Sequence, residues 1–218
     1  MAIYLVAFWA YLLDHRTAVE WLAGHLAGTP LGRAGVLYGI ATICVAKAAA
    51  LRTWGAAYLR SEVVHDSSLH TDAVLADGPY RFVRNPLYLG TFLQAVGFSL
   101  LASRLGAVLL VSLMGIFVWR LMGREEAELA ASQGERYRAY RAAVPKLIPA
   151  LRPRLPAGGR APAWGQAFVG EIFSWTLVIA LGSLIVAHGA QFFYIFLGLG
   201  LVGYAVTVRA QRRGRRAA

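Results

Sequence analysis

Apolar stretches long enough to cross a membrane alternate with short polar stretches along most of the chain. The clearest are residues 34–51, 86–102, 105–122, 167–187 and 191–208. Each approaches the ~20 apolar residues that an α-helix needs to cross the hydrocarbon core of a bilayer. Residues 1–28 are also mostly apolar but carry scattered charges, so they predict one long or broken helix. The pattern predicts an all-α, polytopic bundle of about six transmembrane helices.

The composition agrees with an integral membrane protein. The 218 residues are 58% hydrophobic and only 15% charged, and the mean hydropathy of +0.52 lies outside the usual range for a soluble domain. A net charge of +11 would suggest nucleic-acid binding in a soluble protein. In a membrane protein, however, basic residues gather in cytoplasmic loops. We therefore expect membrane lipids, and no nucleic acid, as partners.

The basic residues also predict how the chain is oriented. They concentrate in residues 52–84, 120–160 and 209–216, whereas few lie in the connections on the other side: Arg16, Arg33 and Arg104. With six spans both termini lie on one side, and the positive-inside rule puts that side in the cytoplasm. We expect a protein of a bacterial inner (plasma) membrane.

The segment 77–90 stands where a polar stretch runs into the apolar stretch 86–102. Its Asp-Gly-Pro start is a turn signal, because Gly78 tolerates positive φ and proline fixes φ. Asn85 followed by Pro86 predicts the start of a helix, with Asn85 as its N-cap. The free N–H groups there favour an anionic or polar ligand, and polar side chains surround them: Tyr80, Arg81, Arg84 and Tyr88. An alternative interpretation is that these arginines and tyrosines only anchor the helix at the membrane interface.

A second polar block, residues 123–149, has a helical pattern with a break at Gly134. The stretches 86–102 and 105–122 are joined only by Ser103-Arg104, so they predict a tight helical hairpin. The far ends of a hairpin lie on the same side, which brings the second block back to the level of segment 77–90. The sequence therefore predicts a pocket at the cytoplasmic face, lined from both blocks by Tyr80, Arg81, Arg84, Asn85, Tyr88, Glu125, Glu126, Tyr137, Tyr140 and Arg141.

The residue types in this pocket limit its chemistry. Neighbouring helical positions point about 100° apart, so at most one of Glu125 and Glu126 faces the pocket; the alternative is that both belong to a solvated helical turn. The sequence shows no Ser/His/Asp or Cys/His set, no phosphate-binding loop and no metal-ligand spacing, and Cys44 is its one cysteine. What remains is a cofactor held by a carboxylate, tyrosines and a helix N-terminus, with a substrate oriented by an arginine.

Two motifs resemble a known family. Residues 78–90, Gly-Pro-Tyr-Arg-Phe-Val-Arg-Asn-Pro-Leu-Tyr-Leu-Gly, are similar to the Gly-x-Tyr-x-x-x-Arg-His-Pro-x-Tyr-x-Gly motif of the isoprenylcysteine carboxyl methyltransferase and phospholipid N-methyltransferase family. The second block resembles that family's Glu-Glu…Gly…Tyr…Tyr…Val-Pro…Pro pattern, through Glu125-Glu126, Gly134, Tyr137, Tyr140, Val144-Pro145 and Ile148-Pro149. The resemblance covers residues 52–149.

The resemblance implies a cofactor, a substrate class and a set of site residues. It implies that S-adenosylmethionine binds at the cytosolic face and that a lipid-like substrate enters from the bilayer. The cofactor site is then lined by Tyr80, Arg84, Asn85, Pro86, Tyr88, Gly90, Glu125 and Glu126, to which we add Gly78, Tyr137 and Tyr140 from the same motifs. Arg84 would orient an anionic acceptor, and Glu125 or Glu126 would hold the cofactor or act as a base. We predict these three as the catalytic residues.

Two positions depart from the family pattern. Asn85 stands where the family usually has His, and an amide cannot shuttle a proton. Ala143 stands where the eukaryotic isoprenylcysteine enzymes carry an Arg before Val-Pro. The predicted reaction is methyl transfer to a lipid-like or prenylated membrane substrate. The alternative is a membrane NADPH-dependent reductase of the steroid-reductase type, which has a similar Arg-His-Pro-x-Tyr-x-Gly run but usually a Glu at the position of Thr91.

The chain divides into three predicted parts. Residues 1–150 form a transmembrane methyltransferase core that contains the motif region 52–149. Residues 151–166, rich in Pro and Gly, form a cytoplasmic linker. Residues 167–218 form a C-terminal transmembrane hairpin and a basic tail.

Overall fold

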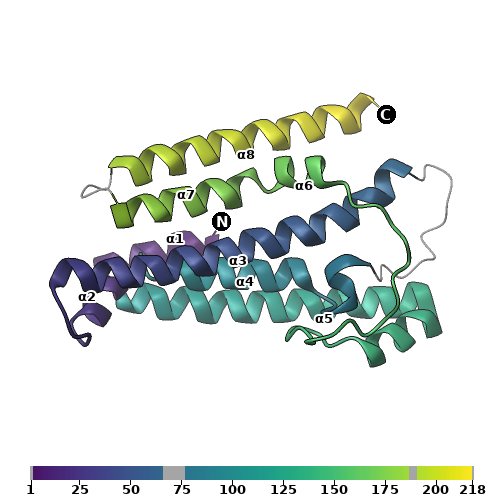
Figure 1. Cartoon of the computed structure of the whole chain (residues 1–218), viewed down its shortest axis with the longest axis horizontal. Helices are drawn as coiled ribbons and strands as arrows, with labels where there is room; N and C mark the ends of the chain where they lie inside the picture. The colour runs from purple at the N-terminus through teal and green to yellow at the C-terminus, as the bar shows by residue number, and fades with distance from the viewer. Residues whose placement is uncertain (1, 66–76, 187–190, 218) are drawn as a thin grey trace.

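The computed structural model describes residues 2–65, 77–186 and 191–217, and this part of the chain is built from helices (Figure 1). In chain order they are α1 (Ala2–Trp9), η1 (Ala10–Leu12), α2 (Ala18–Ala23), α3 (Pro30–His65), η2 (Gly78–Arg81), α4 (Pro86–Ser99), α5 (Arg104–Ala143), α6 (Trp164–Gly170), α7 (Ile172–Val186) and α8 (Gln191–Ala217). No strand occurs among the described residues, where one isolated bridge joins Thr17 to Ser103. The predicted all-α class is confirmed.

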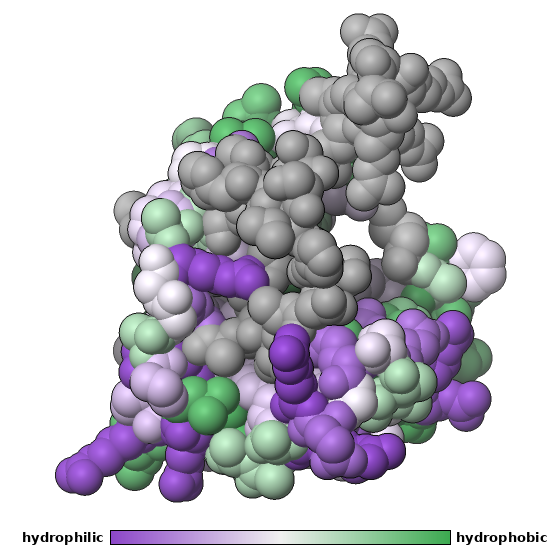
Figure 2. Space-filling model, turned by 90° about the vertical axis from the view of Figure 1, so that its right-hand side faces the viewer, coloured by the Kyte–Doolittle hydropathy of each residue, from purple (hydrophilic) through white to green (hydrophobic). Residues whose placement is uncertain are grey.

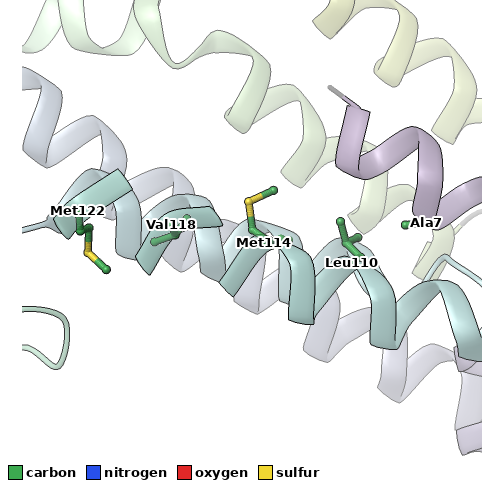
Figure 3. Close-up of a cluster of buried hydrophobic side chains, with 6 residues drawn as sticks. Ala7, Leu110, Met114, Val118 and Met122 are labelled. Carbon is green, nitrogen blue, oxygen red and sulfur yellow. The ribbon is translucent and has the colours of Figure 1, made fainter. Parts of the chain in front are cut away.

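The long helices run side by side. Figure 1 shows α3 between α7 and the hairpin of α4 and α5, with α8 on the outer side of α7. The short α1 packs on α5. The first half of α5 buries one face at a spacing of four residues, through Leu110, Met114, Val118 and Met122, and Ala7 of α1 closes this cluster (Figure 3).

The structure offers fewer clear membrane spans than the sequence predicts. In the described part of the chain, three helical segments are long and apolar enough to cross a membrane: Pro30–Leu59, Arg104–Ala143 and Gln191–Arg209. The helices α6 and α7 are bent by 60° and make a fourth span only if the pair is counted as one. Because α4 has 14 residues and Ala2–Leu12 is also short, the predicted count of six is not confirmed.

Local signals explain where the N-terminal helices break. The apolar run of residues 1–28 is interrupted because Thr17 forms a capping box: its hydroxyl accepts from the N–H of Glu20, and the Glu20 carboxylate accepts from the N–H of Thr17. The first residues of α2 also form hydrogen bonds with the residues that follow α4, and α4 ends at Ser99, before the predicted residue 102. The N–H groups of Ala18 and Val19 donate to the carbonyls of Ala102 and Leu100, so residues 100–103 form a turn instead of another helical turn.

The predicted hairpin and the predicted break are both present. The helix α5 begins directly after Ser103, whose hydroxyl accepts from the N–H of Gly106. It is interrupted at Gly134, where φ is 57° and ψ is −130°, a conformation open to glycine. Beyond Gly134 the chain turns at the end of the molecule that lies on the right in Figure 1, and Figure 2 shows many hydrophilic side chains on this end.

Candidate active site

Two irregular segments lie side by side at this end and position the candidate residues. The N–H of Arg84 donates to the carbonyl of Pro145 at 2.9 Å, and the N–H of Ala150 donates to the carbonyl of Phe82 at 2.9 Å. A third bond joins the N–H of Arg154 to the carbonyl of Arg81. The chain after α5 is thereby tied to the turn that precedes α4, so the two sequence motifs meet.

The carboxylate of Glu126 lies at the centre of this meeting point. Its side chain is only 5% exposed, and it faces donors from two other segments. The amide Nδ2 of Asn85 donates to Oε1 at 3.0 Å. Arg84 Nε lies 3.5 Å from Oε1, and Lys146 Nζ lies 3.5 Å from Oε2. Motif residues separated by about forty positions in the chain therefore converge on one buried charge.

Asn85 occupies the predicted N-cap position of α4, which begins at Pro86, but its side chain does not cap the helix. Its side chain makes no capping hydrogen bond, and its Nδ2 donates instead to Glu126 and to the carbonyl of Lys146. A hydrogen bond to an ionised carboxylate is roughly twice as strong as a neutral one. In addition, Pro86 at the first helical position removes one of the N–H groups that need a cap. The predicted position is therefore correct, while the side chain is oriented by acceptors that are remote in sequence.

The two neighbouring glutamates point in different directions, as the helical period requires. Glu126 is buried and Glu125 is exposed. Glu125 nevertheless has a partner in the first motif, because the hydroxyl of Tyr88 donates to its carboxylate. Both acidic residues therefore contact the start of α4, through different side chains.

The aromatic residues of the two motifs also meet, but they are largely buried. The hydroxyl of Tyr140 donates to the carbonyl of Tyr80 at 2.9 Å, and the rings of Tyr137 and Tyr140 lie 5.9 Å apart. Together with Val144 they form a small core under the second motif. Arg141 is exposed, and its carbonyl accepts from Nη1 of Arg84 at 2.9 Å.

The small residues of the first motif shape the backbone. Gly78 has a φ of +55°, and a Cβ there would lie 2.3 Å from the ring of Tyr58. A Cβ on Gly90 would lie 2.4 Å from Cγ of Arg52, so this glycine lets α3 and α4 approach each other. Pro86 is buried at the start of α4. In the structure these residues serve packing, and their predicted contact with a cofactor stays a prediction.

Lys146 was missed in the sequence analysis. It lies between the Val144-Pro145 and Ile148-Pro149 pairs of the second motif. Its ammonium lies 4.5 Å from the centroid of the Trp119 ring as well as beside Glu126. The sequence indicates Lys146 only as a single basic residue inside the second motif. The neighbouring residues in the chain do not show that its side chain lies beside Glu126.

Comparison with known proteins finds a family that part of this chain resembles. Residues 35–135 match the family model described as phospholipid methyltransferase. The resemblance inferred from the two motifs is thereby confirmed, and the matched region contains Arg84, Asn85 and Glu126 but ends before Lys146.

One similar curated protein is the protein-S-isoprenylcysteine O-methyltransferase of Schizosaccharomyces pombe, at 33% identity over 95 residues. The aligned part is 42% of this chain and 39% of the yeast protein, so the chain matches well under half of that relative. No solved structure matches the chain significantly.

The side chains at this site fit S-adenosylmethionine as a ligand. That cofactor carries an ammonium, a carboxylate, ribose hydroxyls and a cationic sulfur. The site offers two carboxylates, Glu125 and Glu126, and two basic groups, Arg84 and Lys146. Arg84 Nε is buried without a hydrogen-bond partner among the described residues, so this donor of the site is unsatisfied.

Proposed function

We propose that the protein is an integral-membrane methyltransferase that moves a methyl group from S-adenosylmethionine to a lipid-like or prenylated acceptor. The observation that carries this proposal is the convergence of Arg84 and Asn85 from the first motif with Glu126 from the second. The family that residues 35–135 match and the activity for which the yeast relative is named support the same reaction class.

The chain's own residues would act by binding, orientation and charge. When bound, S-adenosylmethionine supplies an electrophilic methyl group on a cationic sulfur. The carboxylates of Glu125 and Glu126 suit its ammonium and hydroxyl groups, and the buried setting of Glu126 strengthens such contacts. A protein promotes methyl transfer mainly by aligning the two reactants and by excluding water from them.

Arg84 would orient an anionic acceptor, as the first motif implies. Its guanidinium is held in place by the carbonyl of Arg141, and its side chain is 8% exposed. An acceptor amine would also need a base. Glu125 is exposed and hydrogen-bonded to Tyr88, so it is the more accessible of the two carboxylates for that role.

We also propose six spans, with both termini and the site in the cytoplasm of a bacterial cell. In this arrangement α4 and the N-terminal helices cross or enter the membrane although they are short. A reporter that is active only in the cytoplasm, fused after Pro149 or after Ala218, should give signal, and one fused after Arg104 should be silent. Signal at Arg104 would overturn this topology.

The alternative, a membrane NADPH-dependent reductase, is not favoured by the family of residues 35–135. Calorimetry on the detergent-purified protein separates the two functions. S-adenosylhomocysteine, the product form of the cofactor, should bind, and NADPH should not. Binding of NADPH alone would overturn the proposed methyltransferase.

A further inference from the structure

The side chain of Lys146 touches Glu126 without a hydrogen bond. Nζ lies 3.5 Å from Oε2 of Glu126 and 4.5 Å from the Trp119 ring centroid. An ammonium has three N–H donors. Within the described residues, Nζ makes an ion pair and a cation–π contact but donates no hydrogen bond. The side chain is 24% exposed, so a ligand can reach it from solvent.

The charges around Glu126 do not balance. Two cations, Arg84 and Lys146, share one buried carboxylate, which leaves one positive charge in surplus. The buried Nε of Arg84 lacks a hydrogen-bond partner in the described part of the chain. A buried donor without a partner costs about 1–3 kcal/mol. An anionic oxygen placed between the two cations would supply both the missing charge and the missing acceptor.

We propose that Lys146 is a binding residue for the amino-acid end of S-adenosylmethionine, an inference that rests on the proposed function. That end carries an ammonium and a carboxylate on the same carbon, so its two charges lie as close together as those of Glu126 and Lys146. When it binds, its carboxylate pairs with Lys146 and Arg84, and its ammonium pairs with Glu126. The ammonium of the ligand takes the place of a cation beside Glu126, and its carboxylate supplies the counter-charge that Lys146 and Arg84 otherwise share.

When the ligand binds, we expect the side chain of Lys146, and not that of Arg84, to change position. Arg84 is fixed by hydrogen bonds from its Nη1 to the carbonyl of Arg141 and from its N–H to the carbonyl of Pro145. The backbone of Lys146 is also fixed, because its carbonyl accepts from Asn85. Its four-carbon side chain, in contrast, is a flexible stem with a compact charge at its end.

The test is calorimetry with two ligands on the full chain and its variants. The ligands are S-adenosylhomocysteine and the analogue that lacks only its carboxylate, in which an aminopropyl group replaces the amino-acid end. Lys146→Met keeps the apolar stem against Trp119 and removes the charge, and Lys146→Arg keeps the charge. Arg138→Met is the matched control, because it removes one positive charge from an exposed ion pair on α5, the helix that carries Glu126.

Lys146→Met should weaken binding of S-adenosylhomocysteine at least tenfold and leave binding of the analogue within twofold of the parent. Lys146→Arg and Arg138→Met should stay within about threefold for both ligands. If the parent binds S-adenosylhomocysteine and Lys146→Met binds it equally well, the inference is wrong while the proposed function stands. This result would be expected if Lys146 contacted only the methyl acceptor. Equal losses for both ligands would also contradict it. If the parent does not bind S-adenosylhomocysteine, the proposed function fails, and the inference fails with it.

Discussion

Two buried glutamates, Glu171 and Glu126, each face an arginine, yet the two pairs are built differently. Glu171 begins the bend between α6 and α7, and Arg52 of α3 meets it with two hydrogen bonds, of 2.8 and 3.0 Å. The hydroxyl of Ser174 donates to the same carboxylate, and Nη1 of Arg52 donates to Thr91 of α4. This ion pair is bidentate and its polar groups are satisfied, so it joins three helices.

The pair at Glu126 is looser. Arg84 Nε approaches the carboxylate at 3.5 Å without a hydrogen bond, and Lys146 lies at the same distance on the other oxygen. A protein that can build the compact pair at Glu171 could satisfy this cluster in the same way. The difference supports the proposal that the cluster at Glu126 keeps donors for a ligand, whereas we expect the pair at Glu171 to stabilise the fold.

The largest expected effect comes from breaking the compact pair. Arg52→Met leaves Glu171 buried without its counter-charge, which should lower the free energy of unfolding by about 3 kcal/mol. Thermal unfolding in detergent measures this loss. The double variant with Glu171→Met removes both charges and should recover most of the stability. A single variant as stable as the parent would show that the pair does not hold α3 to the bend.

The next effect separates the two neighbouring acidic residues. Glu126→Gln should weaken binding of S-adenosylhomocysteine tenfold or more, because a buried charge-assisted contact contributes about 1.5–3 kcal/mol. Glu125→Gln should change binding less than threefold, since Glu125 is exposed. Calorimetry on both variants makes the comparison. If both bind like the parent, the site is wrongly placed.

The features that the sequence predicted correctly depend on local signals. The hairpin follows from a two-residue connection, and Ser103 caps the second helix as its residue type allows. The break in α5 falls on Gly134, the residue that tolerates its backbone angles. The two motifs were recognised because their residue types and spacing lie within short stretches.

The features that the sequence analysis missed depend on partners far away in the chain. Asn85 holds the predicted N-cap position, but its side chain is oriented by Glu126, 41 positions away, and does not cap the helix. Glu171 and Arg52 are separated by 119 positions, so no periodicity links them. The length of α4 was overestimated for the same reason, because α2 bonds to the carbonyls that follow it.

A smaller effect is expected at the looser pair. Arg84→Lys keeps the positive charge but replaces a planar fork by a point charge. Methyl transfer should fall tenfold or more, a loss of about 1.4 kcal/mol in transition-state stabilisation, while the melting temperature stays near that of the parent. A radiolabelled methyl-transfer assay and a thermal scan measure the two quantities. Unchanged turnover would mean that Arg84 only anchors the chain at the membrane surface.

The smallest effect is expected at the opposite end of the molecule, where Asp14 and Arg104 form an ion pair between η1 and α5. The side chain of Arg104 donates to the Asp14 carboxylate from two nitrogens, and the N–H of Leu105 donates as well. These hydrogen bonds lower the pKa of Asp14 to about 2, and the largest contribution comes from the Arg104 side chain. An unfolded Asp has a pKa of about 3.9, so the folded state holds its proton less tightly.

Because the pKa of Asp14 is lower in the folded state, the pair contributes its full stabilisation above pH ~4 and loses it as the pH falls toward 2. Between about pH 5 and pH 3, the melting temperature of the parent should therefore fall slightly more than that of Asp14→Asn. At neutral pH the variant should melt slightly below the parent, since the exposed pair is screened by water. Its affinity for S-adenosylhomocysteine should match the parent, because Glu126 lies at the other end of the bundle. Identical pH dependence in parent and variant would show that the pair does not stabilise the fold.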